Sequence, residues 1–165
     1  MASANSTLAL AAIDAWAQRD KEALLACFSP DFEFILSGQI PDQPLEIHGH
    51  AEYSRFFDTW LASWETFSFA AVRIADVDEA CVLLKTTQFG IARDGMKVDR
   101  VVWFVADVAD GLIARYRAFI DEQAALAAAG VDAWPPDSEL SGADEPPAIQ
   151  GLRSGGGSSS SRLSR

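Results

Sequence analysis

The clearest indication of the fold lies in residues 66–121, which read TFSFAAVRIADVDEACVLLKTTQFGIARDGMKVDRVVWFVADVADGLIARYRAFID. It contains successive runs of β-branched and aromatic residues separated by turn signals, a pattern that predicts strands. The runs cover 66–75, 80–91, 96–107 and 112–121. Asp94-Gly95 suits a two-residue hairpin turn, whose central positions both need positive φ, and Asp110-Gly111 suits the next one. Consecutive hairpins predict an antiparallel sheet.

Three helical patterns precede these strands. Leu10, Ile13 and Trp16 recur at helical spacing and predict a first amphipathic helix. Asp20 is a suitable N-cap for a second, short helix, which Ser29-Pro30 is expected to end. A third helix is predicted from four apolar residues on one face, which we expect to be buried. These residues are Phe57, Trp60, Leu61 and Trp64.

The remaining segments complete a layered arrangement. A strand is predicted over 32–36 and a long loop over 37–49, and a final helix over 122–129 is expected to begin at Asp121 as its cap. The strands are too apolar for one face of the sheet to be fully exposed to solvent, and the three N-terminal helices have an apolar surface that can cover it. We therefore expect an α+β fold in which a curved antiparallel sheet wraps around these helices and encloses a cone-shaped apolar pocket.

Composition limits the classes of function. The chain has 165 residues, enough for one domain, and its 24 acidic and 13 basic residues give a net charge of −11, which disfavours a nucleic-acid partner. No apolar run is long enough for a membrane span, so we expect a soluble protein. Cys27 and Cys81 lack motif spacing and are expected to be free thiols of the cytoplasm. Residues 1–134 are expected to form the domain, and the Pro/Gly/Ser-rich residues 135–165 a disordered tail.

Three short phrases in the right order carry a resemblance to a known family. They are Phe28-Ser29-Pro30-Asp31, Ile47-His48-Gly49-His50 and Asp110-Gly111-Leu112-Ile113. Over about residues 5–134 the chain resembles the nuclear-transport-factor-2-like superfamily, and within it the SnoaL-like polyketide cyclase branch, which is related to limonene epoxide hydrolases and ketosteroid isomerases. The resemblance implies a small cone whose pocket holds a small hydrophobic molecule, and a homodimer formed through the outer sheet face.

The resemblance does not carry the family's catalytic groups with it. The position of the acid/base aspartate of the cyclases falls on Ala118, and the water-orienting tyrosine and asparagine of the hydrolases fall on Phe34 and Leu36. The stretch 85–88 offers no carboxylate where the hydrolases have one. In the first strand, where ketosteroid isomerases have their base, the only carboxylate is Glu33, which is out of register.

Adjacent charges on one strand are the strongest remaining candidates. Strand alternation sends one of Asp99 and Arg100 toward the pocket and the other outward. Counting back from Asp110-Gly111 with a two-residue insertion in that hairpin points Asp99 inward, whereas counting forward from Gly95 points Arg100 inward. A carboxylate inside an apolar cone has its pKa raised by burial and can act as an acid or base near neutral pH. The alternative is a solvated charge pair with a structural role.

Histidines and tyrosines provide further candidates. His48 is expected at the mouth of the pocket as a proton-transfer group, while His48 and His50 lack a third ligand, so no metal site is expected. Tyr53 and Tyr116 are expected to aim hydroxyl groups at a carbonyl or enolate oxygen. Arg115 and Arg117 alternate with Tyr116 and are expected on the outer face.

These residues combine into one leading hypothesis. It is an enzyme that acts on a small hydrophobic, carbonyl-bearing molecule by acid/base proton transfer, in an isomerase, cyclase or hydrolase type of reaction, without cofactor. Asp99, Tyr116 and His48 are the candidate catalytic residues. The expected ligand-binding residues are Trp16, Phe34, Tyr53, Phe57, Trp60, Thr87, Arg100, Trp103 and Ala118. A binding module without chemistry and a dimerisation scaffold with a filled cone are the alternatives.

Overall fold

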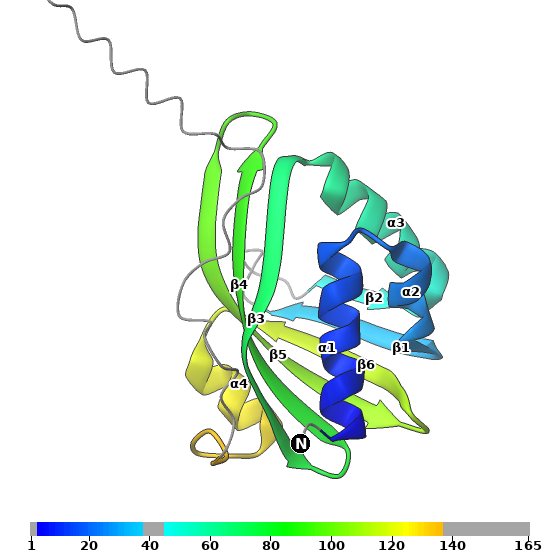
Figure 1. Cartoon of the computed structure of the whole chain (residues 1–165), viewed down its shortest axis with the longest axis vertical. Coiled ribbons are helices and arrows are strands. Elements are labelled where there is room, and N and C mark those ends of the chain that lie inside the picture. Colours follow the sequence, from blue (N-terminus) through cyan, green and yellow to red (C-terminus); the bar gives the residue numbers. More distant parts are fainter. Residues whose placement is uncertain (1–2, 38–44, 137–165) are drawn as a thin grey trace, which may run out of the picture.

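A six-stranded, strongly curved sheet forms the frame of the molecule in the computed structural model, which describes residues 3–37 and 45–136 (Figure 1). The strand order is β2-β1-β6-β5-β4-β3. β1 and β6 run parallel, and every other neighbouring pair is antiparallel. The strands are β1 (Phe28–Ser37), β2 (Leu45–His48), β3 (Trp64–Asp78), β4 (Cys81–Ala92), β5 (Lys97–Ala109) and β6 (Leu112–Phe119).

The helices lie on opposite sides of this sheet. They are α1 (Ala4–Ala17), α2 (Lys21–Ala26), α3 (Gly49–Ala62) and α4 (Glu122–Ala129). The first three gather on the concave side, where α1 packs on β3 and α3 on β1, and α4 lies on the other side against β5 and β4 (Figure 1). The predicted α+β class, with a curved sheet around three N-terminal helices, is confirmed. None of the described helices is long and apolar enough to cross a membrane.

Two helices begin at the capping residues that the sequence predicts. The Asp20 carboxylate accepts a hydrogen bond of 3.1 Å from the Ala23 N–H, and that of Asp121 accepts one of 2.9 Å from the Ala124 N–H. The end of the second helix differs from the prediction. The second helix ends at Ala26 rather than at Ser29-Pro30 because the chain already joins the sheet there, with the Cys27 carbonyl accepting from the Ile113 N–H at 2.9 Å.

The two predicted hairpin turns have different geometries. Asp110 and Gly111 both adopt positive φ, 53° and 75°, and form the expected two-residue turn. At the earlier hairpin only Gly95 does, with φ 89°. There the Gly95 N–H donates to the Ala92 carbonyl, and the Ala92 N–H donates to the Met96 carbonyl, each at 2.8 Å. This loop is therefore one residue longer than predicted, with Gly95 in the left-handed position that closes it.

Two further expectations about the concave side need correction. The predicted loop 37–49 contains a strand, β2, which the sequence analysis missed because four residues with a single buried position carry little pattern. Of the four apolar residues on the third predicted helix face, only Phe57 is buried. Trp60 borders the open pocket described below, and Trp64 lies beyond the helix as the first residue of β3.

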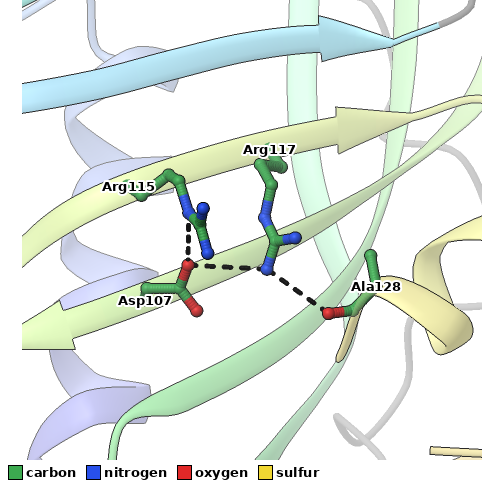
Figure 2. Close-up of polar contacts among 4 residues, drawn as sticks. All are labelled: Asp107, Arg115, Arg117 and Ala128. Atoms are coloured by element: carbon green, nitrogen blue, oxygen red, sulfur yellow. Dashed lines mark hydrogen bonds and ion pairs between the residues drawn. The ribbon is translucent and has the colours of Figure 1, made fainter. Parts of the chain in front are cut away.

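The outer face of the sheet carries a second, smaller core under α4. Leu83 and Val105 pack there against Ala125 and Leu126. Beside it, Asp107 accepts a 2.7 Å hydrogen bond from Arg115 and a 3.4 Å one from Arg117, which also donates to the Ala128 carbonyl in α4 at 3.4 Å (Figure 2). The outward direction predicted for both arginines agrees with this geometry. Apart from Pro135 and Pro136, the predicted disordered tail lies outside the described residues.

Candidate functional site

A pocket opens between the concave face of the sheet and helices α1 and α3. Its volume is about 430 Å³, counted with its open mouth. Aromatic side chains from both helices and from four strands dominate its walls, as is usual for pockets that take apolar ligands. The lining residues are Trp16, Phe34, Leu36, Tyr53, Phe56, Trp60, Phe67, Phe69, Gln88, Arg100, Phe104 and Tyr116.

The aromatic rings support one another around this space. Phe104 and Tyr116 stack with ring centroids 4.7 Å apart, and Phe69 meets Phe104 edge-on at 5.7 Å. Trp16 packs against Phe67 at 6.2 Å. These contacts between aromatic rings hold the side chains in fixed orientations, so the pocket has its shape before a ligand binds.

Two tyrosine hydroxyls lie at the deep end of the pocket. The Tyr53 side chain is fully buried, and its hydroxyl oxygen accepts a 2.7 Å hydrogen bond from the Trp16 indole N–H. The Tyr116 hydroxyl is buried without a hydrogen-bond partner among the described residues. Burial raises the pKa of Tyr53, and it is also the main cause that raises the pKa of Tyr116, with smaller contributions there from Tyr53 and Cys27. Both hydroxyls are therefore hydrogen-bond donors at neutral pH, and neither is a base.

A guanidinium and an amide lie nearer the mouth. The Arg100 Nε–H donates a 3.0 Å hydrogen bond to the Gln88 side-chain oxygen, and the Arg100 guanidinium carbon lies 5.9 Å from the centre of the Trp60 ring. Gln88 is only 6% exposed, so its amide is a fixed support. Burial lowers the pKa of Arg100, although an arginine keeps its charge over the whole physiological range.

The structure decides between the two registers that the sequence leaves open. Arg100 lies opposite Gln88 and lines the pocket, whereas Asp99 lies opposite Phe89, exposed on the outer face. This placement corrects the expectation that Asp99 is the acid or base of the pocket. The physical reason is a bulge between β5 and β6 next to Asp107, where one extra residue reverses every side chain counted back from Asp110-Gly111.

His48 also lies away from the pocket. It precedes α3, its side chain is 55% exposed, and its ring nitrogens lie 3.8 Å from a Glu33 carboxylate oxygen and 3.5 Å from one of Glu46. His50 contacts the Phe28 carbonyl oxygen at 3.0 Å through Nε2. The described part of the chain contains no group of three or more His, Cys, Asp or Glu side chains placed to hold a metal ion.

Of the nine expected ligand-binding residues, the pocket contains Trp16, Phe34, Tyr53, Trp60 and Arg100. Phe57 and Ala118 are core residues that do not reach the pocket. Thr87 and Trp103 have strand partners that place them on the outer face, and Trp103 packs in the core under α4. Tyr116, expected to be catalytic, also lines the pocket.

Six lining residues were missed by the sequence analysis. They are Leu36, Phe56, Phe67, Phe69, Gln88 and Phe104. Directly paired residues on neighbouring strands point to the same face of a sheet. Pairing with Ala118 and Gln88 therefore identifies Phe104 and Phe69 as residues of the inner face. Among the described lining residues there is no Asp, Glu or His, so the wall supplies hydrogen-bond donors and one cation but no carboxylate.

The fold and pocket together define a cone of the nuclear-transport-factor-2-like class. The family model for the SnoaL-like domain matches residues 9–116, and the chain belongs to this family. No curated protein gives a significant match to the sequence.

Solved structures with the same fold have low sequence identity to this chain. TerC, co-crystallised with polyporic acid, is 20% identical, with 74% of this chain and 95% of that chain covered and a TM-score of 0.64. A Mycobacterium tuberculosis protein in complex with estradiol-17beta-hemisuccinate is 17% identical, covering 74% and 97%, with a TM-score of 0.63. An epoxide hydrolase from M. tuberculosis, similar to limonene epoxide hydrolase, is 21% identical, covering 70% and 80%, with a TM-score of 0.56. At these identities the likeness shows the fold.

Proposed function

We propose that the protein binds a small apolar molecule with a carbonyl oxygen, and that the Tyr116 hydroxyl donates a hydrogen bond to that oxygen. The observation that carries this proposal is the buried Tyr116 hydroxyl, which lines the aromatic pocket without a partner among the described residues. A buried hydroxyl without a partner costs free energy, and a ligand acceptor recovers it. The aromatic walls contribute the rest of the binding by removing apolar surface from water.

The ligands of two similar structures support this proposal. TerC was crystallised with polyporic acid and the M. tuberculosis protein with estradiol-17beta-hemisuccinate, both of them small molecules. In this chain the same fold has an open pocket whose walls are mainly aromatic, the kind of surface that binds apolar small molecules.

A simple aromatic ketone, 2-acetonaphthone, is a suitable probe. Trp16 and Trp60 line the pocket, so quenching of tryptophan emission reports occupancy. We expect saturable binding that weakens about tenfold in Tyr116→Phe, the value of one hydrogen bond to a buried acceptor. Phe104→Leu is the matched control, because it changes an apolar wall next to Tyr116 and leaves the hydroxyl in place. Equal affinity in wild type and Tyr116→Phe would contradict the proposed hydrogen bond.

Proton transfer is the second candidate function. Polarisation of a carbonyl by a fixed hydroxyl makes the neighbouring C–H more acidic, which is the first step of many isomerase and cyclase reactions. The step also needs a base, and the described lining contains neither a carboxylate nor a histidine. Deuterium uptake into the methyl group of 2-acetonaphthone in D₂O separates the two functions. Uptake above the buffer rate that is lost in Tyr116→Phe supports an enzyme, and binding without uptake supports a binding module.

A homodimer and a cytoplasmic location belong to the same proposal. The homodimer follows from the family resemblance. The cytoplasmic location follows from the two free, buried thiols, Cys27 and Cys81, which are typical of a reducing compartment. Light scattering of the full chain at several concentrations tests the dimer, and a mass of one chain throughout would contradict it.

A further inference from the structure

Besides Tyr116, the pocket contains a second nearly buried side chain with unused hydrogen-bond donors, Gln88 in β4. Gln88 lies in a row of directly paired residues that crosses three strands, between Phe69 in β3 and Arg100 in β5. All three residues line the pocket. The Gln88 side chain is almost fully buried, so its amide lies among the mainly aromatic walls rather than in bulk solvent.

One hydrogen bond fixes the orientation of this amide. The Arg100 Nε–H donates to the Gln88 side-chain oxygen at 3.0 Å. An arginine side chain has donors and no acceptor, so the oxygen of the amide, and not its nitrogen, faces the guanidinium. Exchanging the oxygen and the nitrogen would bring two donors together. The NH₂ group of Gln88 is therefore held on the side of the amide that points away from the Arg100 Nε–H.

This NH₂ group has no acceptor among the described residues. The one hydrogen bond of the Gln88 side chain in the described part of the chain is the bond that its oxygen accepts. Thr86, which shares this face of β4, differs because its hydroxyl donates to the Val102 carbonyl at 2.8 Å. A nearly buried N–H without an acceptor costs free energy, and an oxygen of a ligand in the pocket recovers it.

We propose that Gln88 is a second oxygen-binding position of the pocket, where its NH₂ group donates to an acceptor at the end of the ligand remote from Tyr116. The ligand class is then a flat apolar molecule with an acceptor oxygen at each end, and an aromatic diketone is the simplest case. This inference rests on the proposed function, because it assigns the second end of the same ligand.

The register of the strands sets the distance between the two ends. Gln88 lies four residues along β4 from Leu84, which pairs with Phe104, and the Phe104 ring stacks on Tyr116 at 4.7 Å. Four residues of strand span about 13 Å. The side chains of Gln88 and Tyr116 both line the pocket and bridge part of this length. A naphthalene core with an acceptor at each end fits the separation that is left.

Three naphthalene probes test the second position, with quenching of tryptophan emission in the full chain as the measurement. They are 2-acetonaphthone, 2,6-diacetylnaphthalene and 2-acetyl-6-isopropenylnaphthalene, in which a CH₂ group replaces one carbonyl oxygen at nearly equal shape. We expect the diketone to bind about tenfold more tightly than the isopropenyl compound. About twofold of this ratio comes from the symmetry of the diketone and about fivefold from one hydrogen bond. Without that hydrogen bond the second carbonyl only loses hydration, which favours the isopropenyl compound.

Two variants assign the preference to the NH₂ group. Gln88→Glu keeps the shape and an acceptor for Arg100 but has no N–H, so the affinity ratio of diketone to isopropenyl compound should fall to about twofold or less. Gln88→Leu should give the same low ratio, and its binding of the isopropenyl compound shows that the pocket is formed. Asp99→Asn, on the outer face of the neighbouring strand, is the control and should keep the wild-type ratio.

The outcomes separate this inference from the proposed function. A wild-type ratio of about twofold or less, or a wild-type ratio that survives in both Gln88 variants, would overturn the second oxygen-binding position. In either case, binding of 2-acetonaphthone that weakens in Tyr116→Phe would leave the proposed function standing. If none of the three probes binds, the proposed function fails and the inference fails with it.

Discussion

The indole N–H of Trp16 in α1 donates a 2.7 Å hydrogen bond to the hydroxyl oxygen of Tyr53 in α3. The contact joins two helices across the deep end of the pocket, and Tyr53 is fully buried. One hydrogen bond thus fixes a pocket wall and the packing of α1 against α3. The neighbouring Tyr116 has no such partner among the described residues, so the two buried hydroxyls differ in role.

Replacing Tyr53 tests its structural role. Tyr53→Phe leaves the Trp16 indole N–H without its acceptor in a partly buried site, which costs about 1–3 kcal/mol. We expect a lower free energy of unfolding by that amount in urea titrations, together with a shift of the Trp16 emission. Unchanged stability would mean that the indole finds another acceptor in the folded chain.

Replacing Tyr116 should have the opposite effect on stability. Tyr116→Phe removes a buried hydroxyl that has no described partner, so we expect the free energy of unfolding to stay equal or rise by up to about 1 kcal/mol. Binding of 2-acetonaphthone should weaken in the same variant. A loss of stability as large as that of Tyr53→Phe would show that the hydroxyl has a structural partner in the full chain.

The sequence correctly predicts the features that depend on a few neighbouring residues, such as helix caps and tight turns. Asp20 and Asp121 begin helices because capping depends on a few neighbouring residues, and Asp110-Gly111 forms its turn because both φ values are local properties. The inward direction of Tyr116 follows from strand alternation once the family resemblance places Ala118 inward, because the two residues share a face of the strand.

The register of β5 could not be predicted in the same way. It depends on a bulge at Ala114 in β6, opposite Asp107 and Val108, and on the number of residues in the loop that ends at Gly95, and neither has a clear sequence signal. A one-residue error exchanges Asp99 with Arg100 and thereby replaces an acid in the pocket by a cation. The chemistry of the site therefore depends on the register of β5, for which the sequence contains no clear signal.

Asp99 provides a direct test of that register. Because its side chain is exposed on the outer face, Asp99→Asn should leave the affinity for 2-acetonaphthone within about twofold of wild type. The neighbouring Arg100 lines the pocket, so Arg100→Met should change this affinity by more than twofold. If Asp99→Asn changes binding as strongly as Arg100→Met does, the register of β5 described here is wrong.

The charge cluster on the outer face makes a separate prediction about stability. Asp107 lies between Arg115 and Arg117, and Arg117 also reaches the Ala128 carbonyl in α4 (Figure 2). The group is partly exposed, so Asp107→Ala should cost about 1 kcal/mol, between the values of exposed and buried pairs. Salt should reduce this difference. Asp99→Ala on the same strand is the control, and an equal loss in both variants would contradict a specific role for the cluster.

Alkaline pH should unfold the protein through its buried acidic protons. Burial is the main cause that raises the pKa of Cys81 from 9.0 to about 11, and the pKa values of Tyr53 and Tyr116 are raised too. The unfolded chain therefore loses these protons at lower pH than the folded chain does, and the stability contributed by Cys81 is present below pH 9 and lost as pH rises toward 11. The slope reaches at most about 1.4 kcal/mol per pH unit for each group.

Urea titrations between pH 8 and pH 11 measure this slope. Cys81→Ala should flatten the fall between pH 9 and pH 10, whatever it does to stability at pH 8, and Tyr53→Phe should flatten it only above pH 10. The two variants thus separate the thiol from the phenol by the pH at which each acts. A stability that stays level up to pH 10.5, or an unchanged slope in Cys81→Ala, would show that the thiol titrates as easily in the folded chain as in the unfolded one.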